Sequence, residues 1–417
     1  MESVSGINLM FENNSPLKGI SVVDISRILA GPSCTQLLGD YGADIIKVER
    51  PQKGDDTRYW GPPFLKNEEG NDSLESSYYL SANRNKRSIT INMANPEGQQ
   101  LVRDLASNSD IFIENFKVGG SHKFGLDYDS LKKNNPELIY CSISGFGQTG
   151  PYANLPGYDF MIQAMGGIMS LTGPEEGEPY KVGVGIADVM CGMYACTAIL
   201  AALQHREKTG EGQYIDISLF DTQVAWLVNS AQNYLTSGQQ PERYGNGHPN
   251  IVPYEVFPTS DGYFALAVGN DVQFKALCEV IEQPQLAVSE DYQKNSSRII
   301  NRKKLIPVLR KSFIGETTDH WLTLLKQHGV PCGPVNNVEQ VFKDPQVIAR
   351  GMKLNMPHPH ISDEKIDLIG NPVKFSTTPV SYRHPPPTLG QHTEQILSER
   401  LQKTDREISN YRQLGII

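Results

Sequence analysis

The stretch ISVVDISRILAGPSCTQLLGDYGADIIKVE, residues 20–49, contains a strand, a helix and a second strand in close succession. Residues 20–26 and 44–49 are short apolar runs rich in Ile and Val, a pattern typical of strands that are buried on both faces. Residues 32–40 between them predict a helix. Because two strands joined through a helix pair in parallel, the stretch indicates a parallel sheet.

The alternation of strands and helices continues along the chain. We expect further strands at residues 87–92, 111–116 and 138–144, with helices beginning at Pro96 and near Tyr128. Strands that alternate with helices of this length form a mostly buried parallel sheet. The sequence therefore predicts a doubly wound α/β domain.

A second, smaller domain is expected after this one. Residues 254–268 (YEVFPTSDGYFALAV) predict a hairpin, and several helices follow it. The tail is rich in proline and has too little periodic structure to fold alone, so we expect it to pack on the first domain. The expected boundaries are a large domain of residues 1–225 and 345–417, a small α+β domain of residues 250–335, and linkers at residues 226–249 and 336–344.

Composition limits the possible partners. The 417 residues are enough for two or three domains, and the net charge of −9 argues against nucleic acid as a partner. A local basic pocket for one small anion is still compatible with that charge. The six cysteines form no C-x-x-C pair, which favours reduced thiols in a cytoplasmic compartment, with Cys191 and Cys196 packed in a core. His358 and His360 lack supporting ligands, so we expect no metal site.

The chain shows no targeting signal and no membrane span. The first residues lack both a long apolar core and an Arg-rich amphipathic face. The most apolar stretch, residues 189–203, is shorter than a span and predicts a buried helix. We therefore expect a cytoplasmic protein without a membrane partner.

Three glycines, Gly145, Gly147 and Gly150, have the spacing G-x-G-x-x-G after a predicted strand. A dinucleotide fingerprint also needs a helix that opens on the third glycine. Pro151 follows that glycine at once, so a helix is not expected there. Two interpretations remain: a loop that reverses the chain, or a loop that carries Asp159 to the ligand edge of the sheet.

Asp159 is a candidate catalytic residue. The carboxylate could act as a helix N-cap, which is a common position for Asp. It could instead be a partly desolvated nucleophile that attacks an activated group such as a thioester. The glycine N–H groups nearby could then stabilise the oxyanion.

Basic residues lie in or around the first two predicted strands and at the start of another, and could bind phosphates, although each alone could be a solvated turn. They are Arg27, Lys47, Arg50, Arg58, Arg84, Lys86 and Arg87. Asn115 and Phe116 end another strand and could contact an adenine, although capping and core packing explain them nearly as well. His248, in the loop GNGHPNIVPY, is either a surface residue or a substrate contact. The sequence contains neither a G-x-S-x-G elbow nor a P-loop.

Eight segments together resemble the family III CoA-transferases, which include formyl-CoA transferase, carnitine CoA-transferase and the α-methylacyl-CoA racemases. The resemblance covers about residues 17–397, and its succinyl-CoA:glutarate branch is the most similar. The segments are LKGISVVDISRILAGP, GADIIKVERP, NRNKRSITIN, IENF, GFGQTGPYANLPGYD, ADVMCGMYA, TGEGQYIDISLFD and PPPTLGQHTEQIL.

The resemblance implies a Rossmann-like large domain, a smaller domain and two subunits interlocked as a homodimer. It implies that Asp159 is the nucleophile, which forms an aspartyl anhydride and then an aspartyl-CoA thioester. Acyl-CoA and a small carboxylic acid would be the substrates, and no tightly bound cofactor is expected. The implied CoA contacts are Arg27, Ile28, Ala30, Arg50, Lys86, Asn115, Phe116, Lys123 and Met193.

Two departures from the family pattern separate the alternatives. Gly245, Gly247 and His248 stand where formyl-CoA transferase has a glycine-only loop, so oxalate chemistry is in doubt and this loop is a candidate substrate loop. Tyr158 stands where the racemase branch has a histidine that would supply a second base. CoA transfer is the leading hypothesis, with an acyl-CoA epimerase or a non-catalytic CoA-binding protein as alternatives.

Overall fold

The computed structural model describes residues 14–67, 69–359 and 361–417, which divide into two compact units. The first unit contains the described residues of Met1–Gly166, Gly183–Trp226 and Gln346–Ile417, and the second contains Gly167–Val182 and Leu227–Pro345. Residues 167–182, which were expected with the large domain, thus group with the second unit. Each unit is described by itself.

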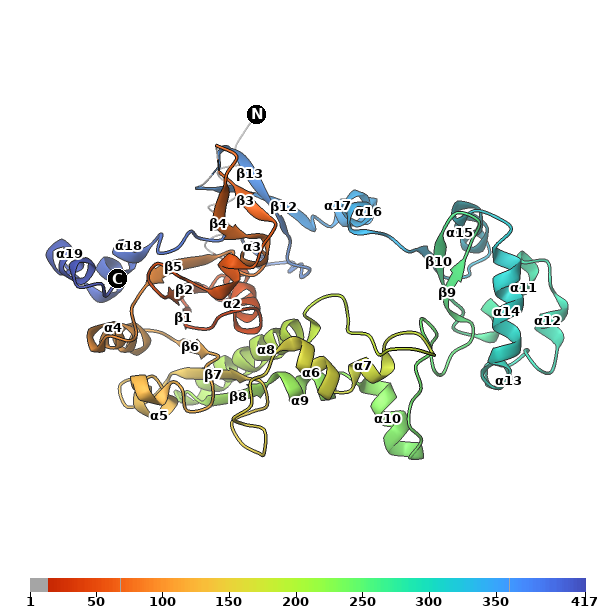
Figure 1. The fold of residues 1–417 in the computed structure, drawn as a ribbon, viewed down its shortest axis with the longest axis horizontal. Helices are drawn as coiled ribbons and strands as arrows, with labels where there is room; N and C mark the ends of the chain where they lie inside the picture. Colours follow the sequence, from red (N-terminus) through yellow and green to blue (C-terminus); the bar gives the residue numbers. More distant parts are fainter. Residues whose placement is uncertain (1–13, 68, 360) are drawn as a thin grey trace. The chain divides into compact units, whose positions relative to one another are not determined.

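The first unit is built on a six-stranded parallel sheet in the order β5-β2-β1-β6-β7-β8 (Figure 1). Its strands are β1 (Ser21–Asp24), β2 (Asp44–Glu49), β5 (Lys86–Thr90), β6 (Ile111–Glu114), β7 (Ile139–Ser144) and β8 (Tyr214–Ser218). The order runs outward from β1 in both directions, so the chain switches direction between β1 and β6. This is the Rossmann order, and the predicted α/β class is confirmed.

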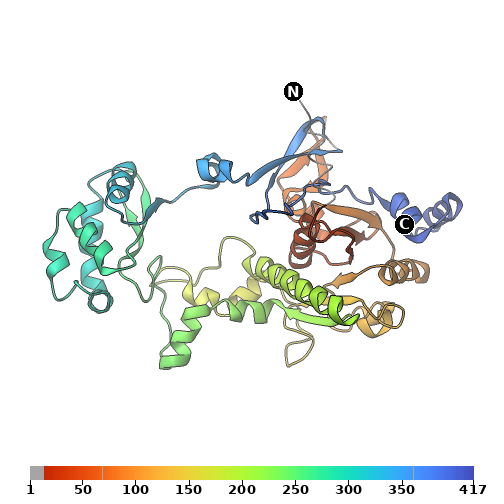
Figure 2. The same cartoon turned by 180° about the vertical axis from the view of Figure 1, so that it is seen from behind.

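Helices cover both faces of this sheet because neighbouring strand residues point to opposite sides. Val22 and Ile45 belong to a core with α2 (Ala30–Asp40) and α8 (Ile186–Thr209). Val23 and Ile46, one position along, belong to a second core with α4 (Pro96–Ser107), α18 (Thr393–Leu401) and α19 (Asp405–Gln413). Figure 2 shows the same layers from behind.

The tail packs on the first unit through backbone hydrogen bonds to β5 and the turn before it. The amide of His392 donates to the carbonyl of Ser88 at 2.9 Å, and the amide of Asn85 donates to the carbonyl of His384 at 2.8 Å. The tail also contains a hairpin of β12 (Lys353–His358) and β13 (Ile361–Ile369). These contacts agree with the expected return of the tail to the first domain.

The remaining elements of the first unit connect or flank the sheet. They are the 3-10 helices η1 (Asp56–Tyr59) and η2 (His122–Phe124), the strands β3 (Phe64–Lys66) and β4 (Asp72–Ser76), and the helices α3 (Ser77–Ser81), α5 (Tyr128–Leu131), α6 (Asp159–Met165) and α9 (Leu219–Ala225).

Two short helices, α6 and α7 (Ile168–Leu171), follow the loop after β7. Gly166 and Gly167 separate them, and Gly167 has a φ of +89°. A residue with a side chain adopts this left-handed conformation only with strain. The glycine pair therefore ends α6 about two turns after Asp159.

The second unit has a sheet of β11 (Cys332–Pro334), β10 (Tyr263–Ala267) and β9 (Tyr254–Pro258). The predicted hairpin is present, because β9 and β10 pair antiparallel. Phe313 packs against Phe257 at 5.1 Å and Phe264 at 5.0 Å between ring centroids. The unit's helices are α7, α10 (Val228–Ser237), α11 (Asp271–Val280), α12 (Gln285–Val288), α13 (Asn295–Ile300), α14 (Arg302–Phe313), α15 (Thr318–Gln327) and α16 (Val338–Lys343), and α17 (Pro345–Ala349) begins where the unit ends.

Within the described ranges, α8 is the single helix long and apolar enough to cross a membrane by length and composition. It supplies buried residues, among them Cys191, Cys196 and Ile199, to the core shared with α2. The core helices of globular proteins have the same composition, so this finding carries no membrane assignment.

Candidate active site

A cavity of about 520 Å³ opens at the carboxyl ends of β1 and β6, where the strand order reverses. Open α/β sheets bind their ligands in the crevice at this switch point. Five predicted CoA contacts line the cavity: Arg27, Ile28, Ala30, Asn115 and Phe116. The candidate nucleophile Asp159 lines the same cavity, so the fold brings the two groups together.

Asn115 joins the ends of the two central strands. Its side-chain oxygen accepts a hydrogen bond from the amide of Arg27 at 3.0 Å, and its side-chain nitrogen donates to the carbonyl of Arg27 at 2.7 Å. The side-chain amide of Asn115 therefore holds the loop after β1 in place. The Arg27 guanidinium reaches Asp56 at 2.5 Å and stays partly exposed beside the cavity.

Ile28 has a φ of 74°, which is rare for a β-branched residue. Its amide donates to the carboxylate of Asp55 at 3.2 Å, and the ammonium of Lys47 pairs with the same carboxylate at 2.9 Å. Lys47 and Asp55 are buried, so this ion pair is held in a low dielectric. The pair fixes the strained backbone that lines the cavity.

The glycine motif closes a loop and does not form a dinucleotide cradle. A Cβ atom on Gly145 would lie 2.5 Å from the Cα of Gly157, so only glycines allow these two backbones to touch. No helix begins on Gly150, and α6 begins at Asp159. The contact returns the chain to the end of β7 and places Asp159 beside the cavity, as the second interpretation of the motif predicted.

Asp159 occupies the first turn of α6 and faces the N-terminus of α8. One carboxylate oxygen accepts from the amide of Ala187 at 2.8 Å and, more weakly, from that of Asp188 at 3.4 Å. The other oxygen accepts from the side-chain nitrogen of Gln163 at 2.7 Å. The N-cap of α6 is Tyr158, so capping is not the role of Asp159 in its own helix. The amides of a helix N-terminus stabilise a carboxylate and hold it in one orientation.

Asp188 is a second carboxyl group in the cavity. Burial and the charge of Asp159 raise the pKa of Asp188 to about 7. Burial and the charges of Asp188 and Asp159 also raise the pKa of Tyr78 to about 12, so its hydroxyl keeps its proton. The site therefore combines a carboxylate held by amides with a carboxyl group that can carry a proton near neutral pH.

The sequence analysis quoted the segment that contains Asp188 but gave this residue no role. An acid in the first turn of a long helix is ordinary, since it suits the helix dipole. The proximity of Asp188 to Asp159 depends on how α6 and α8 meet. Only a contact between elements separated by 28 or more residues along the chain could have revealed it.

The other predicted CoA contacts lie in different places. Arg50 lines a small cleft that shares Arg27 and Phe116 with the main cavity. The Lys123 ammonium lies 4.7 Å from the centroid of the Phe124 ring, which lies 6.0 Å from that of Phe116. Arg50 therefore lies in a cleft next to the cavity, and Lys123 is linked to the cavity residue Phe116 only through Phe124.

Lys86 and Met193 do not line the cavity. Lys86 is fully buried, and its ammonium donates to the carbonyl of Pro32 at 2.9 Å and the side chain of Asn83 at 3.0 Å. Burial lowers its pKa to about 7. Met193 is 48% exposed on α8.

The candidate substrate loop, with Gly245, Gly247 and His248, belongs to the second unit. The ring Nδ1 of His248 accepts from the amide of Asn250 at 3.0 Å. Partial burial and the charge of Arg302 lower the pKa of His248, so this ring is neutral at pH 7. It can therefore offer a hydrogen bond from Nε2 without carrying a charge.

No group of three or more His, Cys, Asp or Glu side chains that could hold a metal ion occurs in residues 14–67, 69–359 and 361–417. His358 is buried, and His360 lies outside the described residues. All six cysteines are free thiols. The charged side chains that line the described cavity are Arg27, Lys117, Asp56, Asp159 and Asp188, set among apolar and aromatic residues.

A Rossmann-ordered sheet with an oriented carboxylate beside a cavity at its switch point defines an α/β protein with a candidate ligand-binding site. Comparison with known proteins identifies the family. The model of CoA-transferase family III matches residues 17–393. The chain belongs to this family and is a CoA-transferase.

Three relatives illustrate the similarity. A succinate–glutarate CoA-transferase of Agrobacterium fabrum is 47% identical over 384 residues, which cover 92% of this chain and 95% of the relative. A human succinyl-CoA:glutarate CoA-transferase is 44% identical over 97% of this chain and 90% of its own length. A crystal structure of a CaiB/BaiF family protein from Brucella suis has a TM-score of 0.83 and 49% identity, and covers 93% of this chain and 100% of that one.

Proposed function

We propose that this enzyme moves CoA from succinyl-CoA to a dicarboxylic acid such as glutarate, with Asp159 as the nucleophile. The observation that carries the proposal is the Asp159 carboxylate, held between the amides of α8 and Gln163 beside the cavity of predicted CoA contacts. The names of the relatives from Agrobacterium fabrum and Homo sapiens support the choice of acids.

The proposed reaction begins when a carboxylate oxygen of Asp159 attacks the thioester carbonyl. The carbon–sulfur bond breaks, CoA leaves as a thiolate, and an aspartyl anhydride forms. The thiolate then attacks the aspartyl carbonyl, which releases the donor acid and leaves an aspartyl-CoA thioester. The acceptor carboxylate reverses these two steps, so the energy of the thioester is kept as long as water is excluded.

Binding energy from the CoA handle would help to position the reacting carbonyl. In the proposal, Arg27, Ile28, Ala30, Asn115 and Phe116 contact the handle in the cavity, and Arg50 and Lys123 attract its phosphates. Lys86 would act from its buried position by supporting α2 through its hydrogen bond to the carbonyl of Pro32. In the proposal, Met193 contacts CoA outside the described cavity. The loop of Gly245, Gly247 and His248 contacts the substrate, also outside that cavity.

The first prediction tests Asp159. We expect the change Asp159→Asn to lower the turnover number at least about 10³-fold, because the amide cannot form either acyl intermediate. CoA binding, measured by calorimetry, should change less than about threefold. Asp129→Asn, at an exposed acid in α5, is the matched control and should keep both properties.

Trapping shows whether the intermediate forms on this residue. Hydroxylamine added after succinyl-CoA should convert Asp159 to a hydroxamate, which peptide mass spectrometry locates. Label on another residue, or transfer by Asp159→Asn at the native rate, would contradict the assignment. Supplying a panel of acids to the native enzyme then identifies the acceptor by the new CoA ester.

An acyl-CoA epimerase is the second candidate, because Asp188 can carry a proton beside Asp159. Such a pair could exchange a proton at the carbon next to the thioester carbonyl. The test is deuterium uptake by a 2-methylacyl-CoA in heavy water. Uptake without transfer to any acid would favour the epimerase, and transfer without uptake would exclude it.

We further propose an interlocked homodimer in the cytoplasm. Large apolar side chains on α6 and α8 are exposed in the single chain, including Phe160, Met161, Met165 and Met193. A partner chain would remove this apolar surface from water. The free thiols suit a reducing compartment. Light scattering during gel filtration should give twice the mass of one chain, and a single-chain mass would contradict the dimer.

A further inference from the structure

The two oxygens of the Asp159 carboxylate are held by different kinds of donor. Oδ1 accepts from the backbone amides of Ala187 and Asp188 in the first turn of α8, where amides have no partner within the helix. Oδ2 accepts from the side-chain nitrogen of Gln163, one turn further along α6. Donors from two helices thus act on separate oxygens of one carboxylate, and together they fix its rotation.

The Gln163 side chain is fully buried and presents its nitrogen to Asp159. The same nitrogen lies 3.4 Å from the carbonyl oxygen of Val184, just before α8. A carboxylate and a carbonyl both accept hydrogen bonds, so this position suits the nitrogen of the amide and not its oxygen. A hydrocarbon side chain of equal length would fill the same space but could not donate. The amide therefore has a use that packing alone does not require.

The two oxygens also differ in what acylation would do to their donors. The start of α8 lies against Oδ1, since a Cβ atom added to Gly185 would lie 3.8 Å from both Cγ and Oδ1 of Asp159. Acylation of Oδ1 would remove its charge from amides that are fixed in the helix. Acylation of Oδ2 leaves Oδ1 as a carbonyl oxygen that still accepts from them. Because a carboxylate oxygen has two lone pairs, Oδ2 can accept from Gln163 and attack with the other pair.

We propose that Gln163 is a positioning residue for CoA transfer, which turns the Asp159 carboxylate so that Oδ2 attacks while Oδ1 stays on α8. The inference rests on the proposed function of Asp159 as the nucleophile. Attack by Oδ2 on the thioester carbonyl breaks the carbon–sulfur bond, and the electron pair leaves with sulfur as the CoA thiolate. Oδ2 then bridges the two acyl groups of the anhydride.

The α8 amides act in the second step of the same reaction. The thiolate adds to Cγ of Asp159, and negative charge develops on Oδ1. The Ala187 amide lies 2.8 Å from this oxygen, which is the distance expected of an oxyanion donor. When the bond between Cγ and Oδ2 breaks, its electron pair moves to Oδ2, which leaves in the carboxylate of the donor acid. The aspartyl-CoA thioester remains, with Oδ1 as its carbonyl oxygen.

Gln163→Met tests the positioning role, because Met has a similar length and cannot donate. We expect turnover from succinyl-CoA, with the best acceptor acid of the native enzyme, to fall about 10²-fold. The KM for succinyl-CoA should stay within about threefold, because the contacts to the CoA handle are unchanged. Thermal unfolding and calorimetric CoA binding show whether the variant is folded.

Gln163→Glu provides a readout that a role in packing alone would not give. A protonated carboxyl group can donate to Oδ2, whereas an ionised one repels it, and burial beside Asp159 should raise the pKa of the new group. The ratio of variant to native turnover should therefore rise about tenfold from about pH 8 to about pH 6, and stay constant in Gln163→Met. The ratio is used because Asp188 and Tyr78 belong to the site in every enzyme compared.

Gln100→Glu is the matched control. The side-chain nitrogen of Gln100 in α4 also donates to an aspartate one turn away, at 2.7 Å from the carboxylate of Asp104. Gln100 is exposed, and neither residue lines the active-site cavity. Its turnover should match that of the native enzyme at each pH.

Two results would overturn the inference: turnover of Gln163→Met within about threefold of the native value, or the same turnover ratio for folded Gln163→Glu at every pH. If Gln163→Glu does not fold, Gln163→Met decides alone. Asp159→Asn separates this inference from the proposed function. An inactive Asp159→Asn with native turnover in the Gln163 variants contradicts only the role of Gln163, whereas an active Asp159→Asn contradicts the nucleophile itself.

Discussion

Asp188 shows how one residue can change its chemistry through its surroundings. The carboxyl group is partly buried in the cavity, and the negative charge of Asp159 lies close to it. Both effects disfavour ionisation, so its pKa rises from 3.8 to about 7. Asp159 itself is held by two backbone amides and by the side chain of Gln163. The cavity therefore contains one oriented carboxyl group and one whose pKa is raised.

This difference predicts a pH dependence of stability. Between about pH 4 and pH 7 the folded protein binds a proton at Asp188 that the unfolded chain has lost, so the free energy of unfolding should fall as pH rises. Asp188→Asn removes this contribution and should reduce the fall by on the order of 2 kcal/mol, after a discount for partial exposure. Urea unfolding at several pH values measures it.

Asp129→Asn serves as the reference for that experiment, since it removes an exposed acid from the same unit. Its pH dependence should follow that of the native protein. An Asp188→Asn profile parallel to the native one would show that Asp188 has an ordinary pKa. The proton-carrying role would then be wrong.

At the scale of elements, the loop between β7 and α6 decides where the nucleophile lies. Gly145 and Gly157 touch backbone to backbone and close the loop, and α6 starts two residues later. The loop thus replaces the direct strand-to-helix turn of a dinucleotide site. The position of Asp159 depends on this contact and on the approach of α8.

Gly145→Ala should therefore damage both stability and catalysis. Its Cβ would lie 2.5 Å from the Cα of Gly157, so a backbone must move. We expect a loss of about 1–3 kcal/mol in the free energy of unfolding and about 10²-fold in turnover, because Asp159 moves with the loop. Thermal unfolding and the CoA-transfer assay measure the two effects.

Gly315→Ala is the matched control, because nothing lies within 4 Å of its Cβ and its φ is outside the left-handed region. It should unfold and turn over as the native protein does. Native turnover in Gly145→Ala would show that the glycine contact does not position the nucleophile.

At the scale of the whole molecule, the first unit is completed by the carboxyl-terminal tail. Ile396 and Leu397 of α18 are fully buried in the core with β1, β2 and α4. Arg58, buried near Glu49 and Glu75, also donates to the tail carbonyl of Pro387 at 3.1 Å. The tail is thus part of the core and not an appendage.

Leu397→Ala tests this dependence. Removing a fully buried leucine leaves a cavity, and we expect the free energy of unfolding to fall by about 2–5 kcal/mol. Leu414→Ala, at a tail leucine that is 56% exposed, should change it by less than about 0.5 kcal/mol. Equal effects from the two changes in urea unfolding would contradict a core role for α18.

The sequence by itself determined the parallel sheet, the hairpin and the candidate nucleophile, because these depend on local patterns. Apolar runs separated by segments with helical periodicity indicate buried parallel strands. Pro151 argues against a helix that begins on Gly150. The resemblance of whole segments added CoA transfer and the predicted CoA contacts Ile28 and Ala30, which line the cavity.

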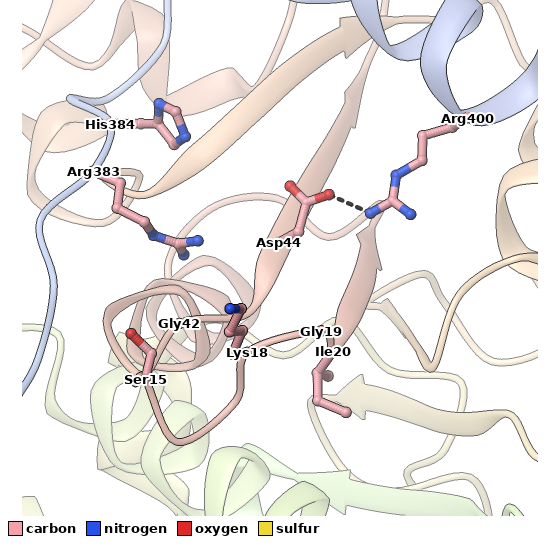
Figure 3. Close-up of a pocket in the computed structure, with 9 residues that line it drawn as sticks. All are labelled: Ser15, Lys18, Gly19, Ile20, Gly42, Asp44, Arg383, His384 and Arg400. Atoms are coloured by element: carbon pink, nitrogen blue, oxygen red, sulfur yellow. Dashed lines mark hydrogen bonds and ion pairs between the residues drawn. The ribbon is translucent and has the colours of Figure 1, made fainter. Parts of the chain in front are cut away.

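Only the tertiary structure decided which side chains meet. Asp188 lies beside Asp159 because α6 and α8 converge. Lys86 can be buried because its ammonium donates to carbonyl and amide oxygens. Arg383 and Arg400 line one cavity with Lys18 because the tail returns to β5 (Figure 3). Apart from the hydrogen bond between Lys86 and Asn83, these contacts join residues far apart in the chain. Local propensity contains no term for such contacts, whereas burial and charge in the packed state depend on them.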